Sequence, residues 1–266
     1  MFPPERIVCL TEETTETLYL LGEQHRIVGI SGYTVRPPQA RKEKPRVSAF
    51  ISADIPKIVA LRPDLVLAFS DLQADIVAGL VREGLNVHVF NQRSVTEILA
   101  MIRTLGALVG APARADAQAA ELAAGLDYFR RETAGRDNRP RVYFEEWDDP
   151  MISGIAWVSE LIEIAGGDDV FPELAGEKLA RNRIVTADQV IRGAPDIIIG
   201  SWCGKKFRPE KVAARPGFDA VPAVRNGRLY EIKSPLILQP GPAALTDGLA
   251  ALRRIIGDGN STRSAD

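Results

Sequence analysis

A pattern of ten residues occurs twice in this chain and constrains the fold more than any other sequence feature. Residues 58–67 read IVALRPDLVL, and residues 190–199 read VIRGAPDIII. Each copy predicts the end of a helix, a Pro-Asp turn and a buried strand, because the residue before a proline leaves the helical region. An aromatic residue ends or soon follows each strand, Phe69 in one copy and Trp202 in the other. The repeat favours two similar lobes, although the same succession occurs in many α/β proteins.

Strands and helices alternate around both copies. Before residue 110 the sequence predicts strands at 6–10, 27–30, 65–69 and 86–90, with helices at 11–21, 54–61, 73–83 and 94–108. After residue 140 it predicts strands at 141–145, 197–199 and 229–232, with helices at 157–165, 186–192 and 243–256. Repeated strand–helix units are typical of parallel sheets that helices cover on both faces.

Residues 113–134, between the two series, predict one long helix. The segment has no proline, one glycine and many alanines, and Leu122, Leu126 and Phe129 are spaced for one face. A helix of about 22 residues is roughly 33 Å long, enough to span a small domain. The expected fold class is therefore α/β, with two Rossmann-like lobes on parallel sheets joined by one long backbone helix. The expected parts are an N-terminal lobe (1–112), a connecting helix (113–135), a C-terminal lobe (136–258) and a disordered tail (259–266).

Charge and composition argue against several classes of function. The formal net charge is −2 and basic residues are scattered, so we expect no nucleic-acid partner. The only histidines are His25 and His88, and Cys9 and Cys203 are far apart, so neither a metal site nor a disulfide is expected. Thr11 begins the segment where a phosphate-binding loop would need glycines, and no GxSxG or HExxH motif occurs. We therefore expect no catalytic residue, no cofactor and no enzyme activity.

The sequence shows no leader and no membrane-spanning segment. A signal peptide would have to precede the first strand, which already begins at Arg6 or Ile7. No apolar run approaches the roughly 20 residues that a bilayer requires. As written, the chain is expected to be cytoplasmic.

Several short stretches nevertheless keep an order and spacing that resemble a known family. They are LG at 21–22, IVGISGY at 27–33, PPQA at 37–40, IVALRPDLVLA at 58–68, SG at 153–154, the segment 161–171, PGF at 216–218 and GRLY at 227–230. Over nearly the whole chain they resemble the class III solute-binding proteins of ABC importers, which bind cobalamin, ferric siderophores or haem. The similarity is closest to the cobalamin-binding branch. It implies a periplasmic monomer that holds a corrinoid in an inter-lobe cleft and meets an ABC permease.

The resemblance also implies particular ligand and docking residues. Tyr33 matches a ligand-contacting tyrosine after the second strand, and Phe50 falls where cobalamin binders have a tryptophan. Pro56 replaces the docking glutamate of the first lobe, which leaves Asp54 as the nearest acid, and Glu210 is the candidate in the second lobe. Leu236 replaces an expected arginine. These departures affect permease docking more than the fold.

A corrin is a large, partly apolar ring edged with amides, so its site needs flat aromatic walls and scattered polar groups. Phe69, at the end of its strand, lies where ligands bind in open α/β sheets. We expect Trp147 and Trp202 to form walls because both follow predicted strands, whereas Trp157 is expected to pack in the core beside its own helix.

The segment from Glu145 to Asp149 is the densest acidic cluster in the sequence. Its carboxylates, Glu145 among them, are candidates to accept hydrogen bonds from a ligand, and a solvated loop is the alternative. Glu145 and Glu146 point to opposite faces if the strand continues, so catalysis by the pair is the least favoured interpretation. Lys205 and Lys206 are candidates for a phosphate or carboxylate of a ligand, again with a solvated loop as the alternative.

Two alternatives remain open beside a corrinoid-binding protein. A ferric siderophore or haem is the first, as another ligand of the same class of protein. The second is a cytoplasmic corrinoid-handling factor or enzyme on the same scaffold, which the missing leader and the altered docking acids favour.

Overall fold

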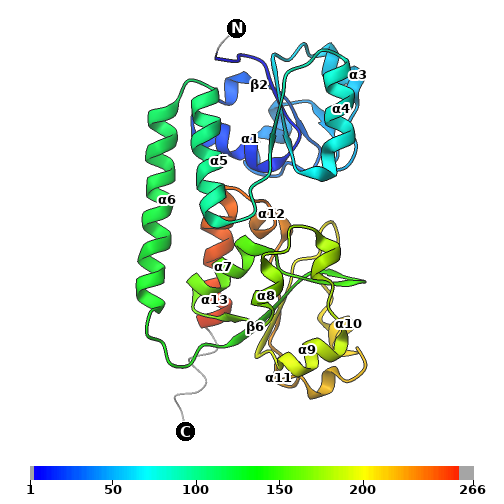
Figure 1. Cartoon of the computed structure of the whole chain (residues 1–266), viewed down its shortest axis with the longest axis vertical. Helices are drawn as coiled ribbons and strands as arrows, with labels where there is room; N and C mark the ends of the chain where they lie inside the picture. The colour runs from blue at the N-terminus through cyan, green and yellow to red at the C-terminus, as the bar shows by residue number, and fades with distance from the viewer. Residues whose placement is uncertain (1–2, 258–266) are drawn as a thin grey trace. The chain divides into compact units, whose positions relative to one another are not determined.

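The computed structural model describes residues 3–257, which form two compact units. Within that range, unit 1 comprises the residues up to Gln92 together with Thr96–Ala123, and unit 2 comprises Arg93–Val95 and the residues from Ala124 onwards. Each unit is built on its own sheet with flanking helices (Figure 1). No helix in this range has the length and apolarity that a bilayer crossing requires.

Unit 1 has a fully parallel sheet with strand order β3-β2-β1-β4-β5. Its strands are β1 (Ile7–Cys9), β2 (Ile27–Ser31), β3 (Arg46–Ser48), β4 (Leu65–Phe69) and β5 (Val87–Phe90). The connecting segments contain α1 (Glu12–Leu20), η1 (Gln24–Arg26), α2 (Ala40–Glu43), α3 (Ile55–Ala60), η2 (Asp71–Gln73) and α4 (Ala74–Arg82). The strand order reverses beside β1, and the carboxyl ends of strands at such a point are where open α/β sheets bind ligands.

The repeated sequence pattern adopts the same backbone turn in both units. Arg62 and Ala194, which precede the two prolines, have positive φ angles of 49° and 42°. The left-handed region is unfavourable for residues other than glycine, so each turn needs other contacts to hold it. The aspartate after each proline supplies them.

Each of these aspartates binds the start of the first strand in its sheet. Asp64 Oδ1 accepts a hydrogen bond from the backbone N–H of Arg6 at 2.9 Å, and Asp196 Oδ2 accepts one from that of Arg141 at 3.0 Å. The two arginine side chains complete the joint, because Arg6 donates to the Leu61 carbonyl at 2.6 Å and Arg141 to the carbonyl of Gly193 at 2.8 Å. The resemblance between the two halves therefore includes the contacts that fix the turn, as well as the order of elements.

Unit 2 has a mixed sheet, which corrects the expectation of a second parallel sheet. Its strands are β6 (Arg141–Asp148), β7 (Met151–Ser153), β8 (Asp168–Asp169), β9 (Ile197–Gly200) and β10 (Leu229–Glu231). The order is β10-β9-β6-β7, with β8 also paired to β6, and only the pairing of β7 is antiparallel among the described strands. The α/β fold class itself is confirmed.

The antiparallel strand arises because β6 runs further than expected. It continues past Glu145 to Asp148, and the chain then turns back into β7. Glu145 pairs with Ser153 and Trp147 with Ile152, so Glu146 is one extra residue in β6, a β-bulge. Trp147 consequently lies on a strand rather than in a loop.

Short helices surround this sheet. They are α7 (Ala156–Ala165), α8 (Pro172–Ala175), η3 (Ala180–Arg183), α9 (Ala187–Gly193), α10 (Pro209–Ala213), η4 (Phe218–Ala220), α11 (Pro222–Arg225) and α12 (Ser234–Ile237). Trp157 on α7 is 3% exposed and donates its N–H to the Ile237 carbonyl at 2.8 Å, so it packs in the core as predicted. Gly200 leaves room for the Phe207 ring, which an added Cβ would meet at 1.9 Å.

The long helix is present as α6 (Pro112–Thr133), which follows α5 (Val95–Leu108). The first half of α6 belongs to unit 1 and the second half to unit 2, with the division after Ala123. The sequence division, with the helix at 113–135 as a part of its own, stays a prediction. In unit 1, Gly106 of α5 lets Ala115 of α6 approach closely. In unit 2, Arg253 pairs with Glu132 of α6 at 2.7 Å.

The last helical segment differs from the single α-helix expected at 243–256. It begins as a π-helical segment, η5 (Ala244–Gly248), and continues as α13 (Leu249–Gly257). A Cβ on Gly248 would lie 2.4 Å from the Leu236 carbonyl oxygen, so this wider turn lies directly against the α12 backbone. The expected tail at 259–266 lies outside the described residues.

Candidate ligand-binding site

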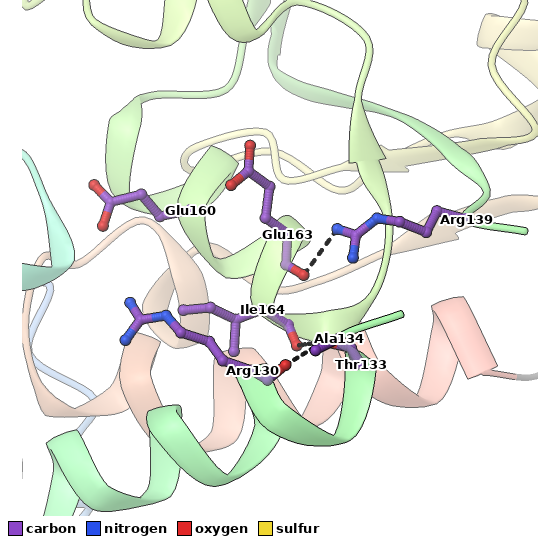
Figure 2. Close-up of a pocket in the computed structure, with 7 residues that line it drawn as sticks. All are labelled: Arg130, Thr133, Ala134, Arg139, Glu160, Glu163 and Ile164. Atoms are coloured by element: carbon purple, nitrogen blue, oxygen red, sulfur yellow. Dashed lines mark hydrogen bonds between the residues drawn. The ribbon is translucent and has the colours of Figure 1, made fainter. Parts of the chain in front are cut away.

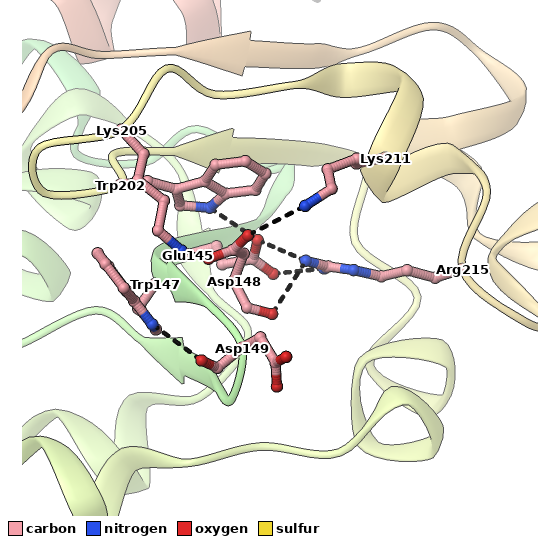
Figure 3. A network of polar contacts seen from close by, with 8 residues as sticks. All are labelled: Glu145, Trp147, Asp148, Asp149, Trp202, Lys205, Lys211 and Arg215. Carbon is pink, nitrogen blue, oxygen red and sulfur yellow. Dashed lines mark hydrogen bonds and ion pairs between the residues drawn. The ribbon is translucent and has the colours of Figure 1, made fainter.

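Glu145 is the most connected side chain at the carboxyl end of the second sheet (Figure 3). It is fully buried, and each carboxylate oxygen accepts two hydrogen bonds. Oε1 accepts from Trp202 Nε1 at 3.0 Å and from Arg215 Nη2 at 2.9 Å. Oε2 accepts from the Tyr143 hydroxyl at 3.0 Å and from Arg215 Nη1 at 2.5 Å. A bidentate guanidinium and two further donors give this buried charge the partners that it requires.

The same contacts fix the protonation of the neighbouring groups. Burial raises the pKa of Tyr143 well above its ordinary value and the negative charge of Glu145 raises it further, so the hydroxyl remains a donor. Burial alone would lower the pKa of Arg215, but the hydrogen bonds and charge of Glu145 outweigh it and the pKa lies above its ordinary value. Tyr143 therefore stays neutral and Arg215 stays charged.

The structure differs from the predicted ligand contacts of Glu145 and Trp202. Glu145 is 0% exposed and Trp202 is 3% exposed, so neither presents a surface to a ligand. The Trp202 ring packs edge-on against Phe207, with ring centres 5.0 Å apart, in the core of unit 2. The physical reason is that a buried carboxylate accepts the indole N–H, which removes the cost of burying that donor.

Glu146 lies on the other face of β6, as the alternation of a strand predicts. Its Oε2 accepts a hydrogen bond from Arg183 Nη1 at 2.6 Å, and the same nitrogen donates to the Ser153 carbonyl. Arg183 is 1% exposed, and no sequence signal marked it. Glu145 and Glu146 are thus occupied by different arginines on opposite faces and cannot act together on one substrate.

Beyond the bulge, accessible side chains gather around Asp148. Asp148 Oδ1 accepts a hydrogen bond from Lys205 Nζ at 2.6 Å, and its Oδ2 lies 3.7 Å from Lys211 Nζ. Lys205 Nζ also lies 3.7 Å from the centre of the half-buried Trp147 ring. Burial would raise the pKa of Asp148, but the Lys205 hydrogen bond and the two ammonium charges hold it below its ordinary value. The structure thus brings together the sequence-predicted residues Trp147 and Lys205, and adds Lys211.

In unit 1, two predicted aromatic residues lie at the carboxyl ends of strands. Tyr33 follows β2 and is 55% exposed, and the half-buried Phe50 follows β3. The fully buried Gln73 fixes the Phe50 segment, because its Nε2 donates to the Phe50 carbonyl at 2.9 Å. Gln73 Oε1 accepts the backbone N–H of Phe69 at 2.9 Å, so one amide side chain connects the ends of two neighbouring segments. The sequence indicated Gln73 only as a helix start.

Phe69 differs from its expected role as a wall of the site. It is the last residue of β4 and is 4% exposed, so its ring belongs to the interior. The cause is that β4 is central in a parallel sheet covered on both faces, where even the last side chain of a strand is enclosed.

Two carboxyl groups that the sequence did not assign to a site lie just past β1. Glu12 and Glu13 are 6% and 1% exposed, and the Oε2 atom of each is among the described buried atoms that accept no hydrogen bond. Burial raises the pKa of Glu12 to about 8, with a further increase from the charge of Glu13. Burial raises the pKa of Glu13 to about 7, although a hydrogen bond from Thr11 opposes the shift. Acidic residues are common in the first turn of a helix, so the sequence alone does not mark Glu12 and Glu13, which are unusual only in being buried.

The two candidate docking acids are both on the surface. Asp54 caps α3, where its Oδ1 accepts the backbone N–H of Lys57 at 3.0 Å. Glu210 lies in the first turn of α10 and is exposed. Their carboxylates are accessible to a partner, and their role in docking stays a prediction.

The next question is whether residues 3–257 contain a metal site or a reactive cysteine. No group of three or more His, Cys, Asp or Glu in this range is placed to hold a metal ion. Cys9 and Cys203 form no disulfide, and the first is buried and the second exposed. Burial raises the pKa of Cys9 to about 12, so this thiol stays protonated.

A surface hollow of about 260 Å³ in unit 2 has a structural role (Figure 2). It lies where the end of α6 meets the end of α7, and it is lined by Arg130, Thr133, Ala134, Arg139, Glu160, Glu163 and Ile164. Arg139 donates to the carbonyls of Glu163 and Gly167 at 3.0 and 2.6 Å, which caps the end of α7 with a positive charge. Its polar groups hold the two helix ends together rather than converge on a ligand.

Comparison with known proteins agrees with this architecture. Residues 7–236 match the family described as periplasmic binding protein. The chain is 25% identical over 262 residues to an uncharacterised ABC transporter substrate-binding lipoprotein, YvrC, of Bacillus subtilis, covering 95% of this chain and 80% of the relative. It is 26% identical over 255 residues to a vitamin B12-binding protein of Vibrio cholerae, covering 92% of this chain and 86% of the relative.

Solved structures show the same fold. The periplasmic haem-binding protein RhuT from Roseiflexus superposes with a TM-score of 0.79 at 24% identity, over 95% of this chain and 99% of that one. The family match extends over most of the chain and includes both sheets. This chain therefore belongs to the periplasmic binding protein family, with the class III fold, and is a substrate-binding protein of the ABC importer type rather than an enzyme.

Proposed function

We propose that this protein binds a corrinoid such as cobalamin at the carboxyl ends of its strands and delivers it to an ABC permease. The observation that carries the proposal is the set of accessible aromatic rings at those strand ends. Tyr33 and Phe50 supply them in unit 1, and Trp147 supplies one in unit 2. Flat, accessible rings suit a large, partly apolar macrocycle.

The relatives support this ligand class. The Vibrio cholerae relative is named for vitamin B12, and it matches the chain over nearly its whole length. The structural neighbour from Roseiflexus is named for haem, another flat macrocycle, so haem is the second candidate ligand. Asp54 and Glu210 are the proposed contacts to the permease.

Absorbance titration separates the candidate ligands. Cyanocobalamin, haem and a ferric siderophore are each titrated with the purified protein, and a saturable change in the cyanocobalamin spectrum at micromolar protein is expected. Trp147→Ala should weaken that binding about tenfold, because one stacked aromatic contributes roughly 1–2 kcal/mol. Tyr128→Ala, which removes an exposed ring on α6, is the matched control and should leave affinity unchanged. Saturable binding of haem or the siderophore alone would refute the corrinoid proposal.

A further inference from the structure

Residues 202–215, here called the 202–215 segment, are attached to β6 by two carboxylates. Glu145 holds both ends, because it accepts hydrogen bonds from Trp202 and Arg215. Asp148 holds the middle through Lys205 and Lys211. The bulge at Glu146 makes this possible, since one extra residue shifts the alternation and places Asp148 on the same side of the strand as Glu145.

The two attachments differ in strength. The Glu145 contacts are buried and fully satisfied, and removing one partner of such a pair is strongly destabilising. The side chains of Lys205 and Lys211 are 42% and 63% exposed, whereas that of Asp148 is 9% exposed, so each pair joins an accessible ammonium group to a largely enclosed carboxylate. The ends of the segment are therefore fixed, while the ammonium groups of the two lysines stay accessible to a further anion.

The charge of the segment favours such an anion. Among residues 202–215 five are basic and one is acidic, namely Lys205, Lys206, Arg208, Lys211, Arg215 and Glu210. Glu145 neutralises Arg215, but Asp148 supplies only one negative charge to two ammonium groups. Lys205 also covers the face of Trp147, so the positive charge and the flat ring are adjacent.

We propose that Lys205 and Lys211 bind an anionic group, a phosphate or a carboxylate, at the edge of a ligand whose flat ring lies against Trp147. The subsite rests on the proposed function, which it refines. On binding, Lys205 leaves the indole face, the ligand ring takes its place, and the anion becomes a further partner of both lysines beside Asp148. Glu145 acts as a positioning residue that keeps the ends of the segment in place during this exchange.

Cyanocobalamin and cobinamide test the phosphate, since they share the corrin ring and its amides but cobinamide lacks the nucleotide phosphate. Lys205→Met and Lys211→Met should each weaken cyanocobalamin about tenfold, or about 1.4 kcal/mol, and change cobinamide less than twofold. Arg208→Met removes an exposed positive charge of the same segment that pairs with neither Trp147 nor Asp148 among the described contacts, and should change neither affinity by more than twofold. Equal weakening of both corrinoids by the lysine variants, or no weakening, would overturn the proposal.

Haem and its dimethyl ester test a carboxylate in the same way, because esterification removes the propionate charges. If the corrinoids do not bind but haem does, and only the free acid depends on Lys205 and Lys211, the subsite stands and the corrinoid assignment fails. If the corrinoids bind without dependence on the lysines, the assignment stands and the subsite fails. If no macrocycle binds, both are wrong.

Discussion

In both units an aspartate after a proline connects the first strand of the sheet to the end of a helix. The two units differ in the buried carboxyl groups at the far end of that strand, because only those of unit 2 have an arginine partner. In unit 1 the chain turns directly into α1, and Glu12 and Glu13 are enclosed without a guanidinium partner. In unit 2 the strand continues into a hairpin, and Glu145 is enclosed together with Arg215.

The comparison shows two ways to bury an acid. A carboxyl group that has no basic partner gives up its charge, which is why the pKa of Glu12 rises to about 8. A carboxyl group with a bidentate arginine keeps its charge and fixes the segments that supply its donors. Unit 1 should therefore respond to pH near neutrality, because its two enclosed carboxyl groups have pKa values of about 8 and 7.

The largest expected effect comes from removing the buried cation in unit 2. Arg215→Met leaves the Glu145 carboxylate buried without its positive partner and should lower the free energy of unfolding by about 3–5 kcal/mol. Urea denaturation at pH 7 measures the loss. The double variant Glu145→Gln/Arg215→Met should lose clearly less, because no unpaired charge remains. A double variant as unstable as Arg215→Met alone would contradict this account.

Glu12→Gln tests whether Glu12 in unit 1 is buried as a neutral acid. The folded pKa of about 8 exceeds the ordinary glutamate value of 4.5, so folding takes up a proton between these pH values, and wild-type stability falls as the pH rises through that window. At pH 9 the variant should be more stable than wild type by on the order of 3 kcal/mol, and at pH 4 the two should be alike. Thermal denaturation across this range decides the matter, and a constant difference at every pH would be evidence against a buried neutral acid.

Asp64→Ala and Asp196→Ala test whether the shared framework matters equally in both units. Each removes a charged acceptor from a backbone N–H at the start of a first strand, and each should lower the free energy of unfolding by about 2 kcal/mol. Hydrogen exchange of the amides of Arg6 and Arg141 measures the local effect. If only one of the two variants lowered the free energy of unfolding, the two aspartates would not stabilise their units equally.

The smallest effect concerns the left-handed turn. Ala194→Gly should raise the free energy of unfolding by about 0.5 kcal/mol, because glycine adopts a positive φ without the steric cost that alanine meets. Ala117→Gly, at an exposed position inside α6, is the matched control and should lower it by about 1 kcal/mol. Both changes are measurable by urea denaturation, and equal signs would argue against strain at Ala194.

The fold class could be predicted because its signals are local. The Pro-Asp repeat, the alternation of elements and the alanine-rich segment each lie within a few turns of chain, and the structure confirms an α/β fold and a long α6. The β6–β7 hairpin could not be predicted, because β7 has only three residues and the bulge interrupts the alternation. Helices of four or five residues, such as α8 and α10, are too short for a periodicity to appear.

The candidate site could be predicted only in part, for a different reason. Trp147 and Lys205 are recognisable because an aromatic or basic residue near the end of a strand is a local feature. The partner of Glu145 is 70 residues away, and nothing near Arg215 in the sequence connects the two. Burial cannot be predicted from local sequence either, because Phe69, Trp202 and Glu12 are enclosed by elements that only the fold brings together.

The side chain of Gln73 connects the backbone at Phe50 to the backbone at Phe69. One amide group donates to the Phe50 carbonyl and accepts the backbone N–H of Phe69, so the two contacts depend on a single rotamer. A molecule that displaces Phe50 must either move this amide or release it. If a ligand displaces the Phe50 backbone, the exchange rate of the Phe69 amide proton should change, even for a compound that has no colour and quenches no fluorescence.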